Sequence, residues 1–196
     1  MTAAIVLAAG LSRRMGRPKL LLDLQGKPVI RHTVERVIAG GCAPVLVVVG
    51  PAHEALRRAL DGLAVRFVVN PTPEAGQSSS VRAGIEAVPA EATTVLIALG
   101  DQPGLLLDVI SRLQQAIGAP GKRIAAPRYA DGLGNPVLFA AAVFPELLTL
   151  SGDRGARSVV EKDPARLAIV DVAAPMPSDL DTPEDYARLN ALDNSR

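Results

Sequence analysis

The sequence AAIVLAAGLSRRMGRPK, residues 3–19, joins a short apolar run to a loop rich in glycine and basic residues. Ala4–Ala8 is continuously apolar, which favours a strand buried on both faces of a parallel sheet. Ligands of open parallel sheets bind beyond the carboxyl ends of the strands, where this loop begins. Gly10 and Gly16 let backbone N–H groups approach a phosphate, because glycine has no Cβ and adopts positive φ. The loop predicts either an anion site or a basic surface, with positive charge from Arg13, Arg14, Arg17 and Lys19.

Further apolar runs and helical patterns alternate along the chain. We expect strands at Val45–Val49, Val65–Val69, Val95–Leu99, Ile124–Ala126 and Leu167–Val172. We expect helices at residues 28–40, 52–60, 78–88, 105–117 and 141–149. This alternation predicts an α/β fold, a single-domain three-layer α/β/α arrangement with a mostly parallel sheet.

One segment interrupts the alternation. Val137–Phe139 is a short apolar run that follows Gly132, Gly134 and Pro136. We interpret it as an inserted antiparallel strand. We expect one domain over residues 1–192 and a frayed C-terminus at residues 193–196.

The composition excludes several classes of protein. The 196 residues are 48% hydrophobic but only 3% aromatic, and 21 Lys+Arg nearly balance 20 Asp+Glu. These values argue against a DNA-binding protein, a disordered chain and a protein that stacks on single-stranded nucleic acid. The one cysteine, Cys42, excludes an intramolecular disulfide and a multi-cysteine metal site. With no signal peptide and no apolar run of about 18 residues, we expect a cytoplasmic protein with no nucleic-acid or membrane partner.

The charge is unevenly spread. Residues 1–50 carry seven basic and two acidic residues, whereas residues 151–196 carry six basic and nine acidic residues. The basic excess fits a phosphate site near the first loop.

The first loop does not match the common phosphate-binding motifs. It is not a P-loop, because five residues separate Gly10 from Gly16 and no Lys-Ser/Thr follows Gly16. It is not a dinucleotide fingerprint either, because Gly-x-Gly-x-x-Gly is absent.

Two further motifs place polar groups next to predicted strands and helices. Asp101, in LGDQP (residues 99–103), follows a buried strand at the edge where Mg²⁺ and phosphates would meet. A turn or helix-capping aspartate is the alternative interpretation. In GQSSSVRAG (residues 76–84), one serine suits a helix N-cap. The other hydroxyls suit hydrogen bonds to a base or ribose.

The acidic motif DLDTPED, residues 179–185, lies near the C-terminus. Thr182–Asp185 predicts a helix start, with threonine as the cap, proline in the first position and acids in the first turn. This leaves Asp179 and Asp181 without a structural explanation.

The longer stretch LAAGLSRRMGRPKLLLDLQGKPV, residues 7–29, resembles the signature of the nucleotidyltransferase family that includes molybdenum cofactor cytidylyltransferases and guanylyltransferases. Further motifs of that family follow in order: NPTPEAGQSSSVRAGI (70–85), LGDQP (99–103), GNPVLF (134–139), SGDRGAR (151–157) and DLDTPED (179–185). The resemblance covers nearly the whole chain, and it implies a Rossmann-like fold of the nucleotide-diphospho-sugar transferase type.

The resemblance also implies roles for individual residues. Lys19, Arg14 and Asp101 would be catalytic, with Lys19 and Arg14 on the phosphates. Asp101 and Asp181 would hold Mg²⁺. Ala9 in LAAG favours CTP, because guanylyl enzymes tend to have LAGG at this position. The nucleotide would be bound by Leu7, Ala8, Ala9, Gly10, Lys19, Gly76, Ser79 and Ser80.

The acceptor side departs from the family pattern. Family members commonly have Gly-His-Pro where this chain has Gly134-Asn135-Pro136. Asn135 can hydrogen-bond an acceptor but cannot titrate. Arg154 and Arg157 in SGDRGAR could bind an anionic acceptor, or the segment could be a loop that enters a surface helix.

The implied reaction is transfer of CMP from CTP to a phosphate-bearing acceptor, molybdopterin, with release of pyrophosphate. A molybdenum hydroxylase would be the partner that receives the product. The alternatives are a transferase of the same fold that uses GTP or another nucleotide and acceptor, and a fold relative that acts as a cofactor-insertion partner or a small-molecule redox enzyme.

Overall fold

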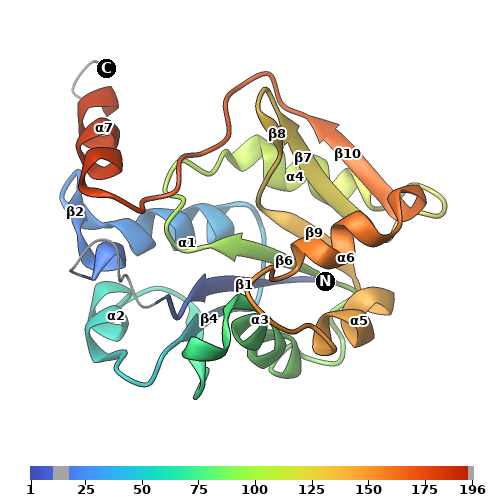
Figure 1. The fold of residues 1–196 in the computed structure, drawn as a ribbon, viewed down its shortest axis with the longest axis horizontal. Coiled ribbons are helices and arrows are strands. Elements are labelled where there is room, and N and C mark those ends of the chain that lie inside the picture. The colour runs from blue at the N-terminus through green and yellow to red at the C-terminus, as the bar shows by residue number, and fades with distance from the viewer. Residues whose placement is uncertain (11–17, 194–196) are drawn as a thin grey trace.

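An eight-stranded sheet forms the centre of the computed structural model, which describes residues 1–10 and 18–193 (Figure 1). Its strands are β1 (Thr2–Ala8), β4 (Val45–Val49), β5 (Val65–Val69), β6 (Thr94–Leu99), β7 (Ile124–Tyr129), β8 (Gly132–Leu133), β9 (Val137–Ala140) and β10 (Leu167–Asp171). The order is β10-β7-β9-β6-β1-β4-β5, with β8 beside β7. Along this order β9 runs antiparallel to both neighbours, and the other pairs are parallel. The predicted strands and the antiparallel insertion are confirmed.

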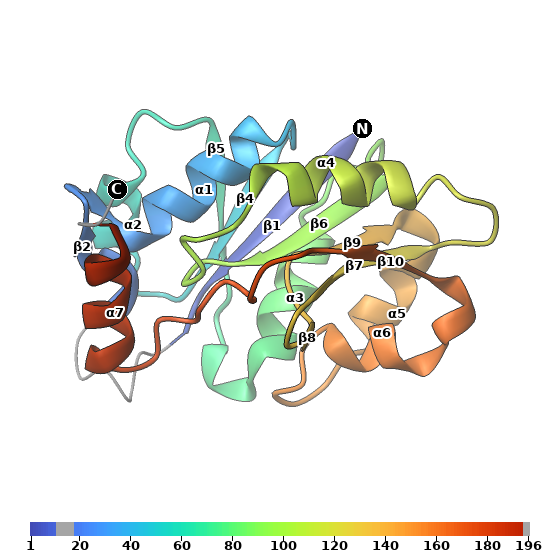
Figure 2. The same ribbon diagram turned by 90° about the horizontal axis from the view of Figure 1, so that it is seen from above.

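Helices cover both faces of the sheet, as Figure 2 shows from above. One face carries α1 (Val29–Ala39), α2 (Glu54–Ala59) and α4 (Leu107–Ala116). The other carries α3 (Gln77–Glu86), α5 (Phe144–Leu148) and α6 (Arg157–Lys162). The 3-10 helix η3 (Ala141–Val143) precedes α5. The three-layer α/β/α arrangement is therefore confirmed.

Residues of β1 alternate between the two faces of the sheet. Ala4 and Val6 belong to the aliphatic cluster beneath α1 and α4, whereas Ile5 belongs to the cluster beneath α3, and all three are 0% exposed. This is the pattern of a strand covered on both sides. α3 approaches β1 at Gly84, where a Cβ would lie 2.8 Å from Cγ2 of Ile5. A larger residue there would push α3 off the sheet.

The C-terminal helix α7 (Pro183–Asp193) packs on a hairpin from the other end of the sequence, formed by β2 (Asp23–Leu24) and β3 (Lys27–Pro28). The Tyr186 hydroxyl of α7 donates a hydrogen bond to the Asp23 carbonyl. Tyr186 and Leu189 of α7 pack against a buried cluster of Leu24, Val29 and Leu180. Figure 2 shows the extended chain that leaves β10 and reaches α7. This route places the acidic motif of residues 179–185 beside the N-terminal part of the chain.

The shortest elements were not predicted. Gln25 (φ 55°) and Gly26 (φ 76°) form the turn of the β2–β3 hairpin, and two positive φ values are typical of a type I′ turn. The sequence did not indicate this turn, because its first position holds glutamine and not the asparagine or aspartate that is typical of it. The strands could not be predicted either, because two residues are too few to show an alternating apolar pattern. The other short elements are the 3-10 helices η1 (Lys19–Leu21), η2 (Pro73–Ala75) and η4 (Pro164–Arg166).

The helices in the described part of the chain lack the length and apolar character of a transmembrane span. Cys42 is buried, and this burial raises the pKa of its thiol to about 11. Asp193, the first of the four residues predicted to fray, is the last residue of α7. The three residues after it lie outside the described residues.

Candidate functional site

The carboxyl ends of β1, β4, β5 and β6 lie at one edge of the sheet, because these strands are parallel. The Gly100 N–H, just after β6, donates to the Leu7 carbonyl in β1 over 2.9 Å, which ties the two strand ends together. Ala8 and Ala9 are buried, whereas Gly10 is exposed, and a Cβ on Gly10 would meet no described atom within 4 Å. The residues that follow Gly10, up to Arg17, lie outside the described part of the chain.

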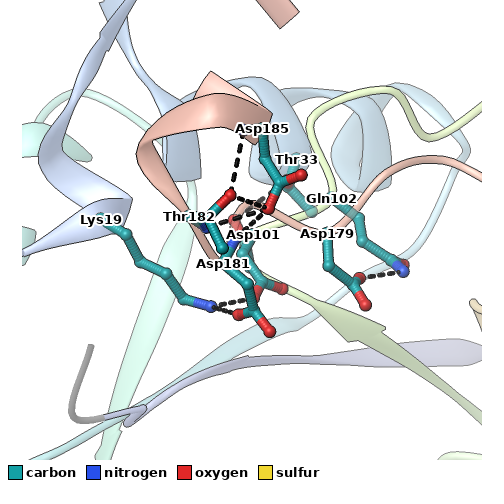
Figure 3. A network of polar contacts seen from close by, with 9 residues as sticks. Lys19, Thr33, Asp101, Gln102, Asp179, Asp181, Thr182 and Asp185 are labelled. Atoms are coloured by element: carbon teal, nitrogen blue, oxygen red, sulfur yellow. Dashed lines mark hydrogen bonds and ion pairs between the residues drawn. The ribbon is translucent and has the colours of Figure 1, made fainter. Parts of the chain in front are cut away.

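Lys19 lies between two aspartates that are far apart in the sequence (Figure 3). Its Nζ donates to Oδ2 of Asp101 over 2.5 Å and to Oδ1 of Asp181 over 2.7 Å. The side chains of Lys19 and Asp101 are 13% and 18% exposed, and that of Asp181 is 36% exposed. Burial acts to lower the pKa of Lys19, but attraction and hydrogen bonds from the two carboxylates outweigh it and raise the pKa. The lysine is therefore held in its charged form.

A reciprocal helix cap fixes the backbone around Asp181. Oδ2 of Asp185 accepts from the N–H groups of Asp181 and Thr182 over 3.2 and 2.9 Å. The Asp185 N–H in turn donates to the Thr182 hydroxyl oxygen over 3.2 Å, which confirms the predicted helix start. The N–H of buried Leu180 donates to the Asp101 carbonyl over 3.2 Å. These bonds hold the segment against the end of β6 and place the two carboxylates together.

Asp179, the other unexplained acid, is hydrogen-bonded to a neighbour of Asp101. Its Oδ1 accepts from Nε2 of Gln102 over 2.7 Å (Figure 3). Gln102 is 4% exposed, whereas Asp179 is an exposed residue. Partial burial and the charge of nearby Asp101 raise the pKa of Asp179. Gln102 was not predicted from the sequence, and the available signal was its position directly after Asp101.

The predicted metal ligands Asp101 and Asp181 converge on a single cation, because both accept from the same ammonium group of Lys19. Two carboxylates, completed by phosphate oxygens and water, suit Mg²⁺. Within residues 1–10 and 18–193, no group of three or more His, Cys, Asp or Glu is placed to hold a metal ion. Arg14 and Gly16 lie outside the described residues.

The three serines of α3 differ in their hydrogen bonds. Asn70, which follows β5 and is 1% exposed, donates from Nδ2 to the hydroxyl oxygens of Ser79 and Ser80 over 2.8 and 3.0 Å. The Ser79 hydroxyl donates to the Thr72 and Gly76 carbonyls over 3.1 and 2.8 Å. Within the described chain, the Ser80 hydroxyl donates to no other group, so its proton remains available. Asn70 was not predicted from the sequence as part of the site.

The prediction that a serine caps α3 is wrong. The N-cap of α3 is Gly76, and no side chain caps it. Gly76 has a φ of 92°, and a Cβ on it would overlap Asp153 Oδ1 and lie 2.8 Å from the Gly152 carbonyl carbon. The Ser78 N–H donates to that carbonyl over 3.2 Å. Gly76 therefore lets the loop around Asp153 pack against the start of α3, and its contact with a nucleotide stays a prediction.

Replacing Asn70 with Ala should lower the free energy of unfolding by about 1–3 kcal/mol, the cost of leaving buried polar groups unpaired. Ser79 and Ser80 lose their donor, and the Thr72 N–H loses its acceptor Oδ1 at 3.0 Å. Urea unfolding measures this change. Asn190→Ala on α7 is the control and should change stability by less than about 0.5 kcal/mol. Wild-type stability in Asn70→Ala would show that the network does not hold this loop.

A cavity of about 630 Å³ opens beside the aspartates and is lined by residues of β6, β9, α3 and α6. Its volume lies in the range of small-molecule sites, about 300–1,000 Å³. Asp179 and Gln102 line it on the side of the aspartates. Asn135, Arg154 and Arg157, the predicted acceptor-binding residues, line it as well. The structure therefore brings these three residues to one cavity.

The chain is similar to known proteins over most of its length. The family model of the MobA-like NTP transferase domain matches residues 4–167. "Nicotine blue oxidoreductase" of Paenarthrobacter nicotinovorans is 33% identical over 195 residues, 94% of each chain. "Probable molybdenum cofactor guanylyltransferase" of Pyrococcus horikoshii is 30% identical over 152 residues, 77% of this chain and 73% of that protein.

A solved structure of similar sequence covers nearly the whole fold. The manganese complex of Rv0371c from Mycobacterium tuberculosis H37Rv superposes with a TM-score of 0.81 at 33% identity, over 97% of this chain and 98% of that one. The family match covers most of the chain, and the site carries a lysine and two aspartates at the carboxyl edge of the sheet. The chain belongs to the MobA-like NTP transferase family and is a nucleotidyltransferase.

Proposed function

We propose that this enzyme transfers CMP from CTP to a phosphate-bearing acceptor of the molybdopterin type. An acceptor phosphate oxygen attacks the α-phosphorus of the nucleotide, the bond from that phosphorus to the oxygen bridging to the β-phosphate breaks, and pyrophosphate leaves. The observation that carries the proposal is the convergence of Lys19, Asp101 and Asp181 beside a cavity. The acceptor phosphate is already ionised, so the reaction needs positioning and charge stabilisation more than a strong base.

The residues around β1 would hold the phosphates. The backbone of Leu7, Ala8, Ala9 and Gly10 would contact the phosphates at the end of β1, and Lys19 and Arg14 would supply positive charge. Asp101 and Asp181 would bind Mg²⁺, which neutralises charge that develops on the phosphates. The manganese complex of the similar Rv0371c supports a divalent ion here.

Hydrogen bonds rather than stacking would recognise the base, because the chain is only 3% aromatic. Ser80 keeps a hydroxyl proton available, while Ser79 and Gly76 shape the loop around it. Ala9 in LAAG supports CTP over GTP. Its side chain is buried at the strand end.

The cavity beside Asp101 would take the acceptor, with Asn135, Arg154 and Arg157 among its polar contacts. The similarity to a protein named for the molybdenum cofactor supports a molybdopterin-type acceptor. A molybdenum hydroxylase would then receive the product.

A second candidate, a small-molecule redox enzyme, is favoured by the similarity to "Nicotine blue oxidoreductase". The lysine and aspartate arrangement supports the transferase.

Pyrophosphate release with CTP, GTP, ATP and UTP, each with and without molybdopterin, tests the proposal. We expect release that requires Mg²⁺ and molybdopterin, with CTP at least about tenfold faster than the other nucleotides. Release with GTP alone would overturn the choice of base. No release with any nucleotide, together with turnover of nicotine blue, would favour the redox candidate. No turnover of any kind would favour a cofactor-insertion partner.

A further inference from the structure

The side-chain amide of Asn70 has one possible orientation, which its neighbours fix. Its Oδ1 accepts from the Thr72 backbone N–H over 3.0 Å, and a backbone N–H can only donate. Nδ2 must therefore face Ser79 and Ser80, to whose hydroxyl oxygens it donates over 2.8 and 3.0 Å. Asn70 is 1% exposed, so these bonds are shielded from water.

The two serines differ in what their hydroxyl groups can still do. The Ser79 hydroxyl shares its single proton between the carbonyls of Thr72 and Gly76. The Ser80 oxygen accepts from Asn70, but in the described part of the chain no group accepts the Ser80 proton. Ser80 is only 6% exposed, and buried hydroxyl groups normally have a hydrogen-bond partner. The Ser80 hydroxyl is therefore set to donate to a ligand.

The serines lie at the same edge of the sheet as the proposed phosphate site. The Asn70 N–H donates to the Val49 carbonyl over 2.8 Å, at the end of β4. Val49 pairs with Ala8 at the end of β1, two residues before Gly10. Neighbouring strands lie about 4.8 Å apart, so a nucleotide that spans two strands from β1 brings its base to Ser80.

We propose that Asn70 is a positioning residue that makes Ser80 a hydrogen-bond donor, and that Ser80 selects a base with an acceptor at ring position 3. This inference rests on the proposed transfer from CTP. Cytosine has an unprotonated nitrogen at position 3, whereas uracil has an N–H there. A donor at position 2 would not separate the two bases, because both carry an oxygen there. A donor at position 4 would favour uracil, which has an oxygen where cytosine has an amino group.

The hydrogen bond from Asn70 is what makes the selection possible. An unrestrained serine hydroxyl can donate to cytosine or accept from uracil, because it carries both a proton and lone pairs. With Asn70 on one lone pair, an N–H at position 3 can reach the other lone pair only by leaving the buried Ser80 proton unpaired. An unpaired buried donor is costly, so uracil binds more weakly.

Three triphosphates test this proposal: CTP, UTP and 3-deaza-CTP. In 3-deaza-CTP a C–H replaces the nitrogen at position 3, while the oxygen at position 2 and the amino group at position 4 remain. Isothermal titration calorimetry with Mg²⁺, in the absence of an acceptor, measures the three affinities without transfer. We expect the wild type to bind CTP at least about tenfold more tightly than UTP or 3-deaza-CTP, because each of these two leaves the Ser80 proton unpaired.

The Asn70→Asp variant reverses the direction of the hydrogen bond to Ser80. Its carboxylate still accepts from the Thr72 N–H. Because a carboxylate only accepts, the Ser80 proton turns toward it and the Ser80 oxygen is left to accept from the ligand. We expect the advantage of CTP over UTP to fall to about threefold or less. The added negative charge acts on all three triphosphates alike, so the ratio of affinities isolates the effect.

Two further variants separate base recognition from a structural role. Ser80→Ala should bind CTP and 3-deaza-CTP within about threefold of each other, because the donor is gone. Asn190→Asp is the matched control, since Asn190 also donates from Nδ2, to the Tyr186 carbonyl on α7 over 3.2 Å, and lies away from the serines. Its ratios should equal those of the wild type. A substitution that only loosened the loop would weaken all three nucleotides and leave the ratios unchanged.

Two results would overturn the proposal. Equal affinity of the wild type for CTP and 3-deaza-CTP would show that Ser80 does not donate to position 3. An unchanged ratio of CTP to UTP in Asn70→Asp would show that Asn70 only holds the loop. In either case, transfer of CMP to molybdopterin would leave the proposed function standing. If the ratios change as expected but molybdopterin receives no CMP, the proposed acceptor fails and the roles of Asn70 and Ser80 stand.

Discussion

Replacing Asp101 with Asn lowers the rate of nucleotidyl transfer by about 10²–10³-fold, the typical cost of removing one electrostatic contact to the reacting group. The substitution preserves size, and the amide oxygen can still accept from Lys19. The backbone carbonyl that binds the Leu180 N–H is unchanged. The substitution removes one of the two negative charges that face the ammonium group of Lys19, where a metal ion would bind. We therefore expect the loss in kcat rather than in the midpoint of thermal unfolding.

Steady-state pyrophosphate release gives kcat and KM, and circular dichroism monitors the fold. Asp181→Asn should cause a comparable loss, and Asp179→Asn a smaller one, because Asp179 hydrogen-bonds to a glutamine instead of the lysine cluster. Asp108→Asn is the control, since Asp108 pairs with Arg112 on α4 at 3.6 Å. A wild-type kcat in Asp101→Asn would remove this carboxylate from the catalytic machinery.

Much of the fold could be predicted because its strands are buried on both faces. Val45–Val49 is fully apolar and fully buried, so its strand shows directly in the sequence. The antiparallel β9 could be recognised because glycines and a proline interrupt the alternation before it. The β2–β3 hairpin could not, because its pairing depends on backbone angles at Gln25 and on packing with α7.

The site was harder to predict than the fold, because its partners are far apart in the sequence. Asp101 could be singled out by its place after a buried strand, but Asp181 was suggested only by family resemblance. Its position depends on the cap of α7 and on Leu180, which no local pattern reveals. Asn70 was missed for the same reason, because its significance lies in the hydroxyls that it meets in space.

Replacing Lys19 with Met should weaken catalysis and strengthen metal binding at the same time. Transfer falls by about 10²–10³-fold, because the charge near the reacting phosphate is lost. Without nucleotide, Mn²⁺ binds at least about tenfold more tightly, because the metal no longer has to displace an ammonium group from Asp101 and Asp181. Without metal, Lys19→Met lowers the free energy of unfolding by about 1–3 kcal/mol, because two carboxylates lose their counter-charge. Breaking a fully buried ion pair would cost more, but the side chains of Lys19, Asp101 and Asp181 are 13–36% exposed.

Electron paramagnetic resonance of free Mn²⁺ measures the affinity, and thermal unfolding with and without Mn²⁺ shows whether the metal restores the lost stability. Lys27→Met is the control, because Lys27 is half exposed and pairs with Glu35 away from the aspartates. Unchanged Mn²⁺ affinity in Lys19→Met would mean that the two aspartates do not form a metal site. Tighter binding would mean that Lys19 occupies the cation position until nucleotide arrives. Movement of the lysine toward the incoming phosphates would then remove its ammonium group from both carboxylates.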